Sequence, residues 1–356
     1  MSYQGHDLIF IISQPKAGST LLQRILAGHE DIQTSAETWL MLHPSYGLRK
    51  TGIEADYNAN WAATGVQEFL DNYADGAQTY VEGIRSFAET IYGRVLEKHG
   101  KRLFLDKTPR YTMIVNQLYE LFPEAKYVLL IRNPLAILKS ELHTYVGEDW
   151  PVLSSFAPDL VAAPGRLIAA RDILGDAALE VRYEDLVSAP EDTLRELCEF
   201  LRIEFDAGML NYSDTPTPVG RMNDPVGIHQ HTAPSTGSLD KWTQLGTDGQ
   251  LRHFALQYLE VLGDRTVTEL GYDAAELRAR IEQATIGKPV RHIYPWRLAI
   301  TPRRRWNLRD HITSAYLLAS QSRGRVAGII AALNVLWGRV GGGFVRLANR
   351  DSNGLK

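Results

Sequence analysis

The sequence predicts an α/β protein with a central parallel sheet flanked by helices. Short apolar runs have the character of buried strands, and helical apolar spacing follows each run along most of the chain. The runs are Leu8–Ile12, Leu103–Leu105, Tyr127–Ile131 and Leu179–Val181. Ligands of such sheets bind beyond the carboxyl ends of the strands, so we expect the functional residues there.

Helices are expected between and after these strands. The first begins directly after the first strand, around Leu21. The others are predicted at Val66–Tyr73, Val81–His99, Tyr111–Leu121, Leu135–Tyr145, Thr193–Leu201, Gln250–Leu262 and Asp273–Ala284. Asn211–Ser238 lacks apolar periodicity and is rich in turn-forming residues, as functional or disordered loops are. These elements define a body of residues 1–287.

Composition favours a globular cytoplasmic protein of 356 residues. One cysteine, Cys198, excludes an intramolecular disulfide framework and a cysteine-based zinc site, and its helical apolar surroundings predict a core position. No run approaches the roughly 18 apolar residues of a membrane span. The amino terminus also lacks the pattern of a signal peptide.

The chain is divided by charge. Residues 288–356 hold 13 basic residues against two acidic ones, a net charge of +11, which leaves −15 for the rest of a chain whose total is −4. From Val326 onward, apolar side chains fall on one helical stripe beside several arginines, although Gly341–Gly343 opposes a continuous helix. We expect a basic helical carboxyl-terminal extension.

Two interpretations of this extension remain open. We favour a helix that packs on the acidic body or in a homodimer interface. The alternative is peripheral contact with an anionic membrane surface. Nucleic-acid binding is not expected, because the basic residues lack interleaved stacking aromatics in a recognisable fold.

The strongest functional signal follows the first strand. The loop reads Pro15-Lys16-Ala17-Gly18-Ser19-Thr20 and leads into a helix. Backbone N–H groups, small hydroxyls and the positive end of the helix dipole converge there, an arrangement that binds phosphate. In nucleoside triphosphatases the lysine follows the last glycine, whereas Lys16 stands two residues before Gly18. The loop is therefore P-loop-like, with a differently placed lysine.

A second signal follows the strand Tyr127–Ile131. Arg132 stands at the strand's end, Asn133-Pro134 forms an expected N-cap and N1 pair, and Ser140 lies two turns into the helix. The guanidinium suits phosphate, and the serine adds a hydroxyl donor. An arginine in this place is also commonly a surface ion-pair partner.

Together these stretches resemble the nucleotide-binding motifs of sulfotransferases that use 3′-phosphoadenosine-5′-phosphosulfate (PAPS). In that family, a loop of the form Pro-Lys/Arg-Ser/Ala-Gly-Thr/Ser-Thr holds the 5′-phosphosulfate. An arginine with a serine eight residues later holds the 3′-phosphate, which is the spacing of Arg132 and Ser140. Further matches follow in order at Phe104–Tyr111, Val181–Val187 and Leu239–Trp242. The resemblance runs from about Leu8 to about Gly271, and it is closest to the bacterial and tyrosylprotein-type branch.

The resemblance implies an enzyme that transfers a sulfuryl group from PAPS to a hydroxyl or amine, without a metal. Lys16 would neutralise the leaving phosphate. Lys107 would reach the sulfonate, or else pair with Asp106 or another carboxylate. Donor contacts from Tyr183, Lys241 and Trp242 are also implied, although a tyrosine at a strand end is equally often part of the core.

The resemblance also implies a general base that takes the acceptor's proton. Glu37 is our candidate, because tyrosylprotein-type members carry a glutamate in the segment that Thr34–Leu40 matches. Many cytosolic members use a histidine instead. The histidines that remain open for this role are His43, His143, His229 and His231.

Two alternatives to a sulfotransferase are a P-loop kinase that uses ATP and a catalytically silent, membrane-associated nucleotide-binding protein. A kinase needs a Lys-Ser/Thr pair after the glycine and a magnesium-binding acid, neither of which stands in the loop. A catalytically silent protein is not favoured, because the chain retains Lys16, Arg132 and Ser140. The sequence does not distinguish between a sugar, a lipid head group, a phenol and a peptide tyrosine as the acceptor, and the basic extension favours a lipid only slightly.

Overall fold

The computed structural model describes residues 2–49, 53, 56–146, 150–212 and 233–287, together with 312, 316, 326, 329–330 and 332–333. The chain groups into two compact units. The first comprises Met1–Ile137 and Ala163–Lys241, and the second Leu138–Ala162 and Trp242–Lys356. The predicted boundary at 287/288 stays a prediction, since nearly all of the basic extension lies outside the described residues.

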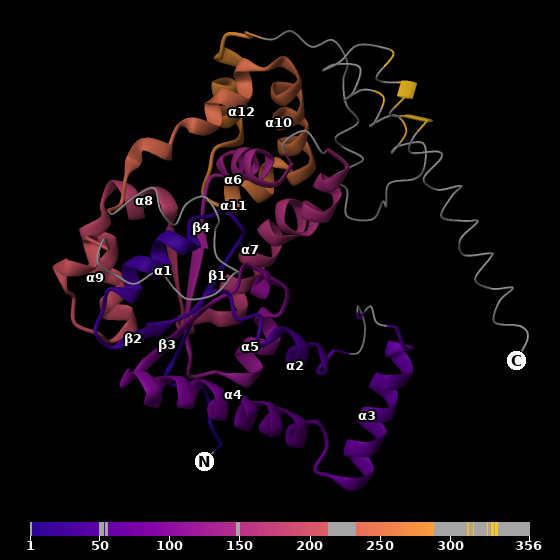
Figure 1. The fold of residues 1–356 in the computed structure, drawn as a ribbon, viewed down its shortest axis with the longest axis vertical. Coiled ribbons are helices and arrows are strands. Elements are labelled where there is room, and N and C mark those ends of the chain that lie inside the picture. The colour runs from indigo at the N-terminus through magenta and orange to yellow at the C-terminus, as the bar shows by residue number, and fades with distance from the viewer. Residues whose placement is uncertain are drawn as a thin grey trace, which may run out of the picture. The chain divides into compact units, whose positions relative to one another are not determined.

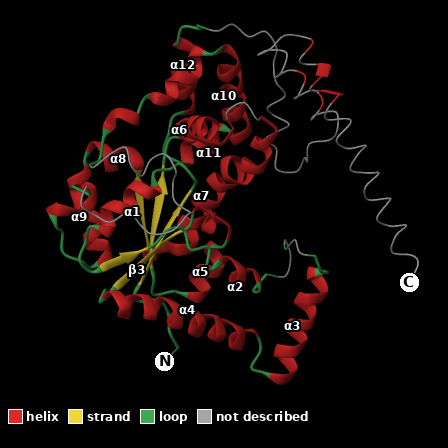
Figure 2. Ribbon diagram, in the orientation of Figure 1, coloured by secondary structure: helices red, strands yellow, loops and turns green. Residues whose placement is uncertain are grey.

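The first unit is built on a parallel sheet of five strands (Figure 2). The strands are β1 (Leu8–Ser13), β2 (Ile32–Thr34), β3 (Leu103–Lys107), β4 (Lys126–Ile131) and β5 (Ala178–Arg182). Their order is β2-β3-β1-β4-β5, and every neighbouring pair is parallel. Four strands and the fold class are confirmed. The sequence did not predict β2, because its residues Ile-Gln-Thr do not form the apolar run that marks the other four strands.

Helices cover both faces of this sheet (Figure 1). In this unit they are α1 (Ser19–Ala27), α2 (Leu42–Tyr46), α3 (Ala59–Tyr73), α4 (Ala77–His99), α5 (Val115–Leu121), α7 (Ala163–Leu174), α8 (Tyr183–Ser188) and α9 (Pro190–Leu201). Helices α1, α8 and α9 pack on one face of the sheet, and α4, α5 and α7 pack on the other. Helix α6 (Pro134–Glu141) runs from the first unit into the second.

The core of the first unit centres on β1, whose six residues are all buried. Phe10 on this strand stacks with Tyr127 and Phe122, at ring-centroid distances of 5.5 and 5.8 Å. The Tyr127 hydroxyl donates to the carbonyls of Leu118 and Phe122, both at 2.9 Å. A strand buried on both faces reads as a continuous apolar run, as Leu8–Ile12 does.

The second unit is helical in its described part. Its helices are α10 (Gly249–Leu262), α11 (Asp264–Glu269) and α12 (Ala274–Gln283), beside the π-helical segments Leu142–Val146 and Pro158–Ala162. Asp248 caps α10 by accepting the N–H groups of Gln250 and Leu251 at 2.9 and 3.1 Å. The buried Tyr258 hydroxyl of α10 donates to the carbonyl of Leu160 at 2.9 Å.

The strand order brings five loops to one edge of the sheet. From β1 the chain moves to one side for β2 and β3 and then to the other side for β4 and β5. Because all strands are parallel, the segments after Ser13, Thr34, Lys107, Ile131 and Arg182 begin at the same, carboxyl edge. A change of direction next to the central strand is where open α/β sheets bind ligands.

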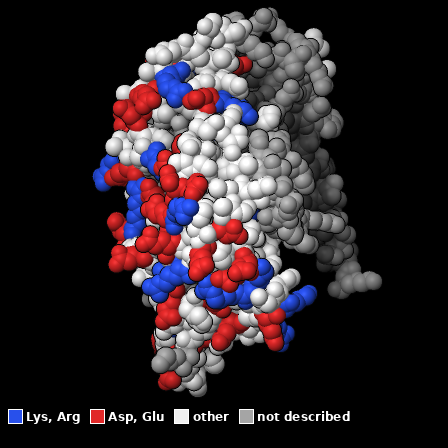
Figure 3. Space-filling view, turned by 90° about the vertical axis from the view of Figure 1, so that its left-hand side faces the viewer, with Lys and Arg blue, Asp and Glu red and all other residues white. Residues whose placement is uncertain are grey.

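The described surface is mixed in charge. Acidic and basic side chains lie next to one another over the face in Figure 3. Exposed ion pairs such as Arg195–Glu191 add little to stability, since solvent screens them. Within the described residues, no helix is both long and apolar enough to span a bilayer.

Candidate active site

The loop after β1 has a backbone that few residues adopt. Lys16 has a φ of +61° and Gly18 a φ of +96°, both in the left-handed region. Non-glycine residues with positive φ are uncommon and cluster at functional sites. Gly18 is the N-cap residue of α1, and no side chain caps that helix end. A Cβ on Gly18 would overlap the ring of Tyr183, so the position requires glycine for two reasons.

Arg132 lies against this loop. Its Nη1 donates to the backbone carbonyl of Lys16 at 2.8 Å, and its guanidinium carbon stands 4.0 Å from the centroid of the Tyr183 ring. The Tyr183 hydroxyl is hydrogen-bonded to the Ser238 hydroxyl at 2.6 Å. The structure thus brings together three residues predicted separately: Lys16, Arg132 and Tyr183. Tyr183 is buried between Gly18 and Arg132, and its contact with the donor stays a prediction.

The start of α6 is held by two side chains. The Asn133 side-chain oxygen accepts the N–H of Leu135 at 2.9 Å, which confirms the predicted N-cap. Glu184, which the sequence analysis did not single out, accepts the N–H of Asn133 at 3.0 Å. Ser140 lies further along α6, in the second unit, so its partnership with Arg132 stays a prediction.

Glu37 and Lys107 form an ion pair at the same sheet edge. Lys107 Nζ donates to Glu37 Oε1 at 3.0 Å, and the Lys107 side chain is only 1% exposed, against 18% for Glu37. The sequence analysis named both residues and left a carboxylate partner for Lys107 open. That partner is Glu37 rather than Asp106. A buried ammonium needs a partner of this kind, because an unpaired charge inside a protein is costly.

Asp106 is fully buried and serves as a hydrogen-bond acceptor. Its Oδ2 accepts the hydroxyls of Thr38, Tyr92 and Tyr111 at 2.8, 2.7 and 2.9 Å. Thr108 donates to Oδ1 over a longer 3.4 Å. Burial raises the pKa of Asp106 above its ordinary value, and the hydroxyl hydrogen bonds oppose that rise. The sequence analysis missed this cluster, whose members are spread from residue 38 to residue 111.

The remaining predicted residues differ in burial, and they do not all belong to the first unit. Lys241 is exposed, whereas Trp242 is buried in the second unit with the Arg280 guanidinium 4.7 Å from its ring centroid. His43 and His143 are exposed, and His229 and His231 lie outside the described residues. Cys198 is buried in α9, as predicted, and burial raises the pKa of its thiol.

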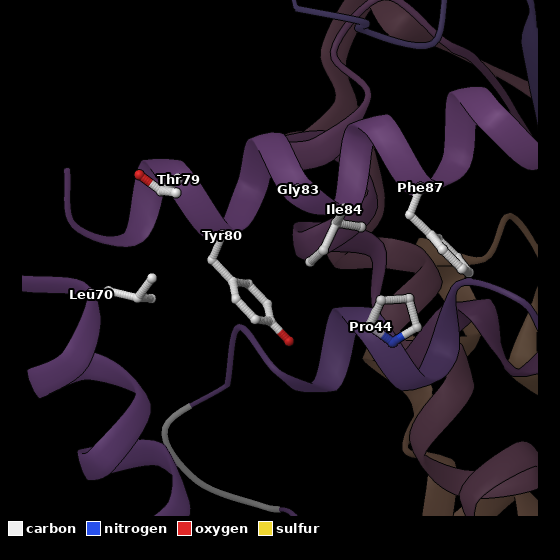
Figure 4. A pocket seen from close by; sticks show the side chains of 7 residues that line it. All are labelled: Pro44, Leu70, Thr79, Tyr80, Gly83, Ile84 and Phe87. Carbon is white, nitrogen blue, oxygen red and sulfur yellow. The ribbon is translucent and has the colours of Figure 1, made fainter. Parts of the chain in front are cut away.

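Two hollows are lined by residues outside the loop after β1. A groove of about 480 Å³ between α2, α3 and α4 is lined by Pro44, Leu70, Thr79, Tyr80, Gly83, Ile84 and Phe87, none of them charged (Figure 4). A second hollow, of about 630 Å³, belongs to the second unit and includes Lys139, His143 and Asp248. Neither contains Lys16, Glu37, Lys107 or Arg132. In the described part of the chain, no three His, Cys, Asp or Glu side chains are grouped to hold a metal.

The chain that carries this loop, arginine and ion pair matches a known family. The model of the sulfotransferase family matches residues 7–207. The chain therefore belongs to the sulfotransferase family, and the resemblance drawn from its motifs is confirmed.

Individual relatives agree with this assignment. The chain is similar to nodulation protein NoeE of Sinorhizobium fredii (strain NBRC 101917 / NGR234), with 30% identity over 77% of this chain and 68% of that protein. It is also similar to a putative protein-tyrosine sulfotransferase of Caenorhabditis briggsae, with 24% identity over 72% of this chain and 89% of that protein. The sulfotransferase domain from the curacin biosynthetic pathway shares the fold, with a TM-score of 0.50 at 24% identity, covering 71% of this chain and 96% of that domain.

Proposed function

We propose that the protein transfers a sulfuryl group from PAPS to a hydroxyl or amine of a small-molecule, glycan or lipid acceptor, and releases 3′-phosphoadenosine-5′-phosphate. One observation carries the proposal. The Lys16 loop, Arg132 and the Glu37–Lys107 ion pair all lie at or just after the carboxyl ends of strands in one parallel sheet. Membership of the sulfotransferase family supports the reaction class.

The roles of the residues follow from where charge develops. The bond between sulfur and the bridging oxygen breaks, and sulfur forms a new bond to the acceptor atom. Lys16 neutralises the leaving phosphate, and the N-terminal N–H groups of α1 with Ser19 and Thr20 bind its oxygens. Lys107 contacts the sulfonate, and the Glu37 carboxylate takes the proton that the acceptor loses.

Arg132 is proposed to bind the 3′-phosphate together with Ser140. Its Nη1 already donates to the Lys16 carbonyl, and its buried Nε makes no hydrogen bond to any described residue. A guanidinium can donate from several positions at once, so one side chain can join the phosphosulfate loop to a second phosphate. Pro15, Ala17, Lys241 and Trp242 complete the proposed donor site.

Isothermal titration separates this proposal from a kinase. We expect 3′-phosphoadenosine-5′-phosphate to bind more tightly than ATP, and tighter binding of ATP would overturn the choice of donor.

The Lys16→Ala variant should lose transfer of labelled sulfate from PAPS while its thermal melt is unchanged, because Lys16 is half-buried in a loop. The matched control is Lys98→Ala, an exposed lysine on α4, which should keep full activity.

The acceptor needs a separate experiment, because the donor site carries no information on it. Labelled PAPS would be incubated with the protein and fractionated extracts of the source cell. Label recovered in a lipid, glycan or small-molecule fraction would identify the acceptor class, and the Lys16→Ala variant would give the background.

A further inference from the structure

The segment that carries Glu37 has no regular secondary structure, yet side chains hold its backbone closely. Three consecutive amides after Thr38 donate to hydroxyls. Trp39 N donates to Thr108 Oγ1 at 3.3 Å. Leu40 N donates to Thr38 Oγ1 at 3.1 Å, and Met41 N donates to Tyr111 Oη at 3.2 Å. The backbone next to Glu37 is therefore tied to the Asp106 cluster.

Asp106 sets the direction of these hydrogen bonds. A hydroxyl has one proton, so a threonine or tyrosine that donates to a carboxylate leaves only lone pairs for its other neighbours. Thr38 and Tyr111 both donate to Asp106 Oδ2, and both accept a backbone N–H of the Glu37 segment. If a hydrogen-bond donor stood in place of Asp106, the hydroxyls would accept from it. Their own protons would then point toward the backbone amides, and the hydroxyls could not accept the amide N–H groups.

The backbone conformation of the segment requires such support. Trp39 has a φ of +53°, in the left-handed region. For a residue with a Cβ this conformation costs on the order of 1 kcal/mol or more, and it persists where the surroundings determine it. The hydrogen bonds that the N–H groups of Trp39 and Met41 donate to Thr108 and Tyr111 hold the backbone of Trp39 in this conformation.

Two neighbouring residues of β3 hold two neighbouring residues of the segment. Asp106 accepts from Thr38, and Lys107 donates to Glu37. Successive side chains of a strand point to opposite faces, so the segment is held on both sides of β3. A misplacement of about 1 Å can cost a catalytic group roughly a hundredfold in rate.

We propose that Asp106 and the hydroxyls it orients, those of Thr38, Tyr92, Thr108 and Tyr111, are positioning residues that hold Glu37 at its place beside Lys107. The proposal rests on the proposed role of Glu37 as the base. Asp106 is fully buried, so its carboxylate is not exposed to a bound donor or acceptor. It acts through Thr38 and Tyr111, and the cluster is expected to affect turnover and not donor binding.

The test removes one hydroxyl while the shape of the side chain is kept. Thr38→Val should lower kcat by about tenfold or more. The KM for PAPS and the affinity for 3′-phosphoadenosine-5′-phosphate should stay within about twofold, because neither depends on where Glu37 lies. Thr38→Ser keeps the hydroxyl and should restore most of kcat. Tyr111→Phe, which removes a second hydroxyl, should reproduce the Thr38→Val result.

Tyr127→Phe is the matched control. Tyr127 is as buried as Tyr111, and its hydroxyl makes two hydrogen bonds, but to Leu118 and Phe122, outside the cluster. Tyr127→Phe should lower the stability of the protein and leave both kcat and KM unchanged. Normal kcat in Thr38→Val, or a Thr38→Ser variant as slow as Thr38→Val, would overturn the proposal.

Glu37→Gln distinguishes this failure from a failure of the proposed function. If Glu37→Gln keeps full turnover, Glu37 is not the base and the proposed mechanism fails. If Glu37→Gln is inactive while Thr38→Val and Tyr111→Phe turn over normally, only the positioning role fails. Thermal melts of every variant identify one that does not fold.

Discussion

Gly18 and Tyr183 constrain each other at the loop after β1. The glycine has a backbone conformation that other residues avoid, and the tyrosine ring occupies the space where a side chain would lie. Arg132 in turn covers the ring and binds the loop carbonyl at Lys16. A side chain at Gly18 would therefore displace Tyr183, and with it Arg132 and the loop carbonyl that Arg132 binds.

We predict that Gly18→Ala weakens donor binding at least tenfold. Alanine at this φ costs about 1–2 kcal/mol in backbone strain, and its Cβ displaces Tyr183 and with it Arg132. Titration with 3′-phosphoadenosine-5′-phosphate measures the effect. Gly93→Ala on α4 is the control, because nothing lies within 4 Å of its Cβ. That change should stabilise the helix by about 0.5–1 kcal/mol and leave binding unchanged. Equal affinities in the two variants would contradict the prediction.

Candidate residues could be named at this scale, but most of their partners could not be predicted. Lys16 and Arg132 stood out from their local sequence, whereas Glu37 and Lys107 were named through the resemblance to the family. Lys107 and Glu37 are 70 residues apart, and Arg132 and Lys16 are 116 apart. Local patterns contain no information on such pairs. Asp106 was considered only as an ion-pair partner, because its hydroxyl donors are scattered along the chain.

At the scale of elements, most long periodic segments were predicted, and the missed elements are short except for α7, which has 12 residues. The strands β1, β3, β4 and β5 are confirmed within two residues at each end, whereas β2, α2, α7, α8 and α11 were not predicted. The stretch Tyr111–Leu121, expected as one helix, is a 3-10 turn at Pro109–Met113 followed by α5. Tyr111 belongs to the Asp106 cluster, and that tertiary contact accompanies the change of helix type.

We predict that the cap of α6 matters for binding as well as for stability. Asn133→Ala removes the acceptor for the N–H groups of Leu135 and Ala136, which should cost about 1 kcal/mol. It should also weaken binding of 3′-phosphoadenosine-5′-phosphate, because α6 follows Arg132 directly.

Asp248→Ala is the matched control for the cap. It removes the same kind of cap from α10, so denaturant unfolding should show a similar loss. Asp248→Ala should change the affinity for 3′-phosphoadenosine-5′-phosphate only slightly. A loss of affinity as large as that of Asn133→Ala would mean that the two caps act only through stability.

At the scale of the whole molecule, the basic extension is the main open feature. It carries a net charge of +11 against −15 for the remainder, and nearly all of it lies outside the described residues. Opposite charges within one chain favour the packing of the extension on the acidic body. Contact with an anionic membrane is the competing interpretation.

We therefore predict that the 356-residue chain does not sediment with anionic phospholipid vesicles at physiological salt. A variant with Arg339, Arg346 and Arg350 changed to Glu should behave in the same way. Sedimentation of the native chain that is lost in the variant would instead establish a membrane surface for the extension. Light scattering on both proteins tests the homodimer interpretation, because the triple change should shift a dimer toward monomer.

The sequence by itself determined the alternation of strands and helices and the family, and it predicted a phosphate-binding first loop. These depend on local patterns, namely apolar spacing and short motifs in a fixed order. Only the tertiary structure decided which residues meet. The order β2-β3-β1-β4-β5 brings Glu37 to Lys107 and Arg132 to Lys16, and it surrounds Asp106 with hydroxyls. Strand order results from the packing of distant segments, and no single stretch of sequence contains it.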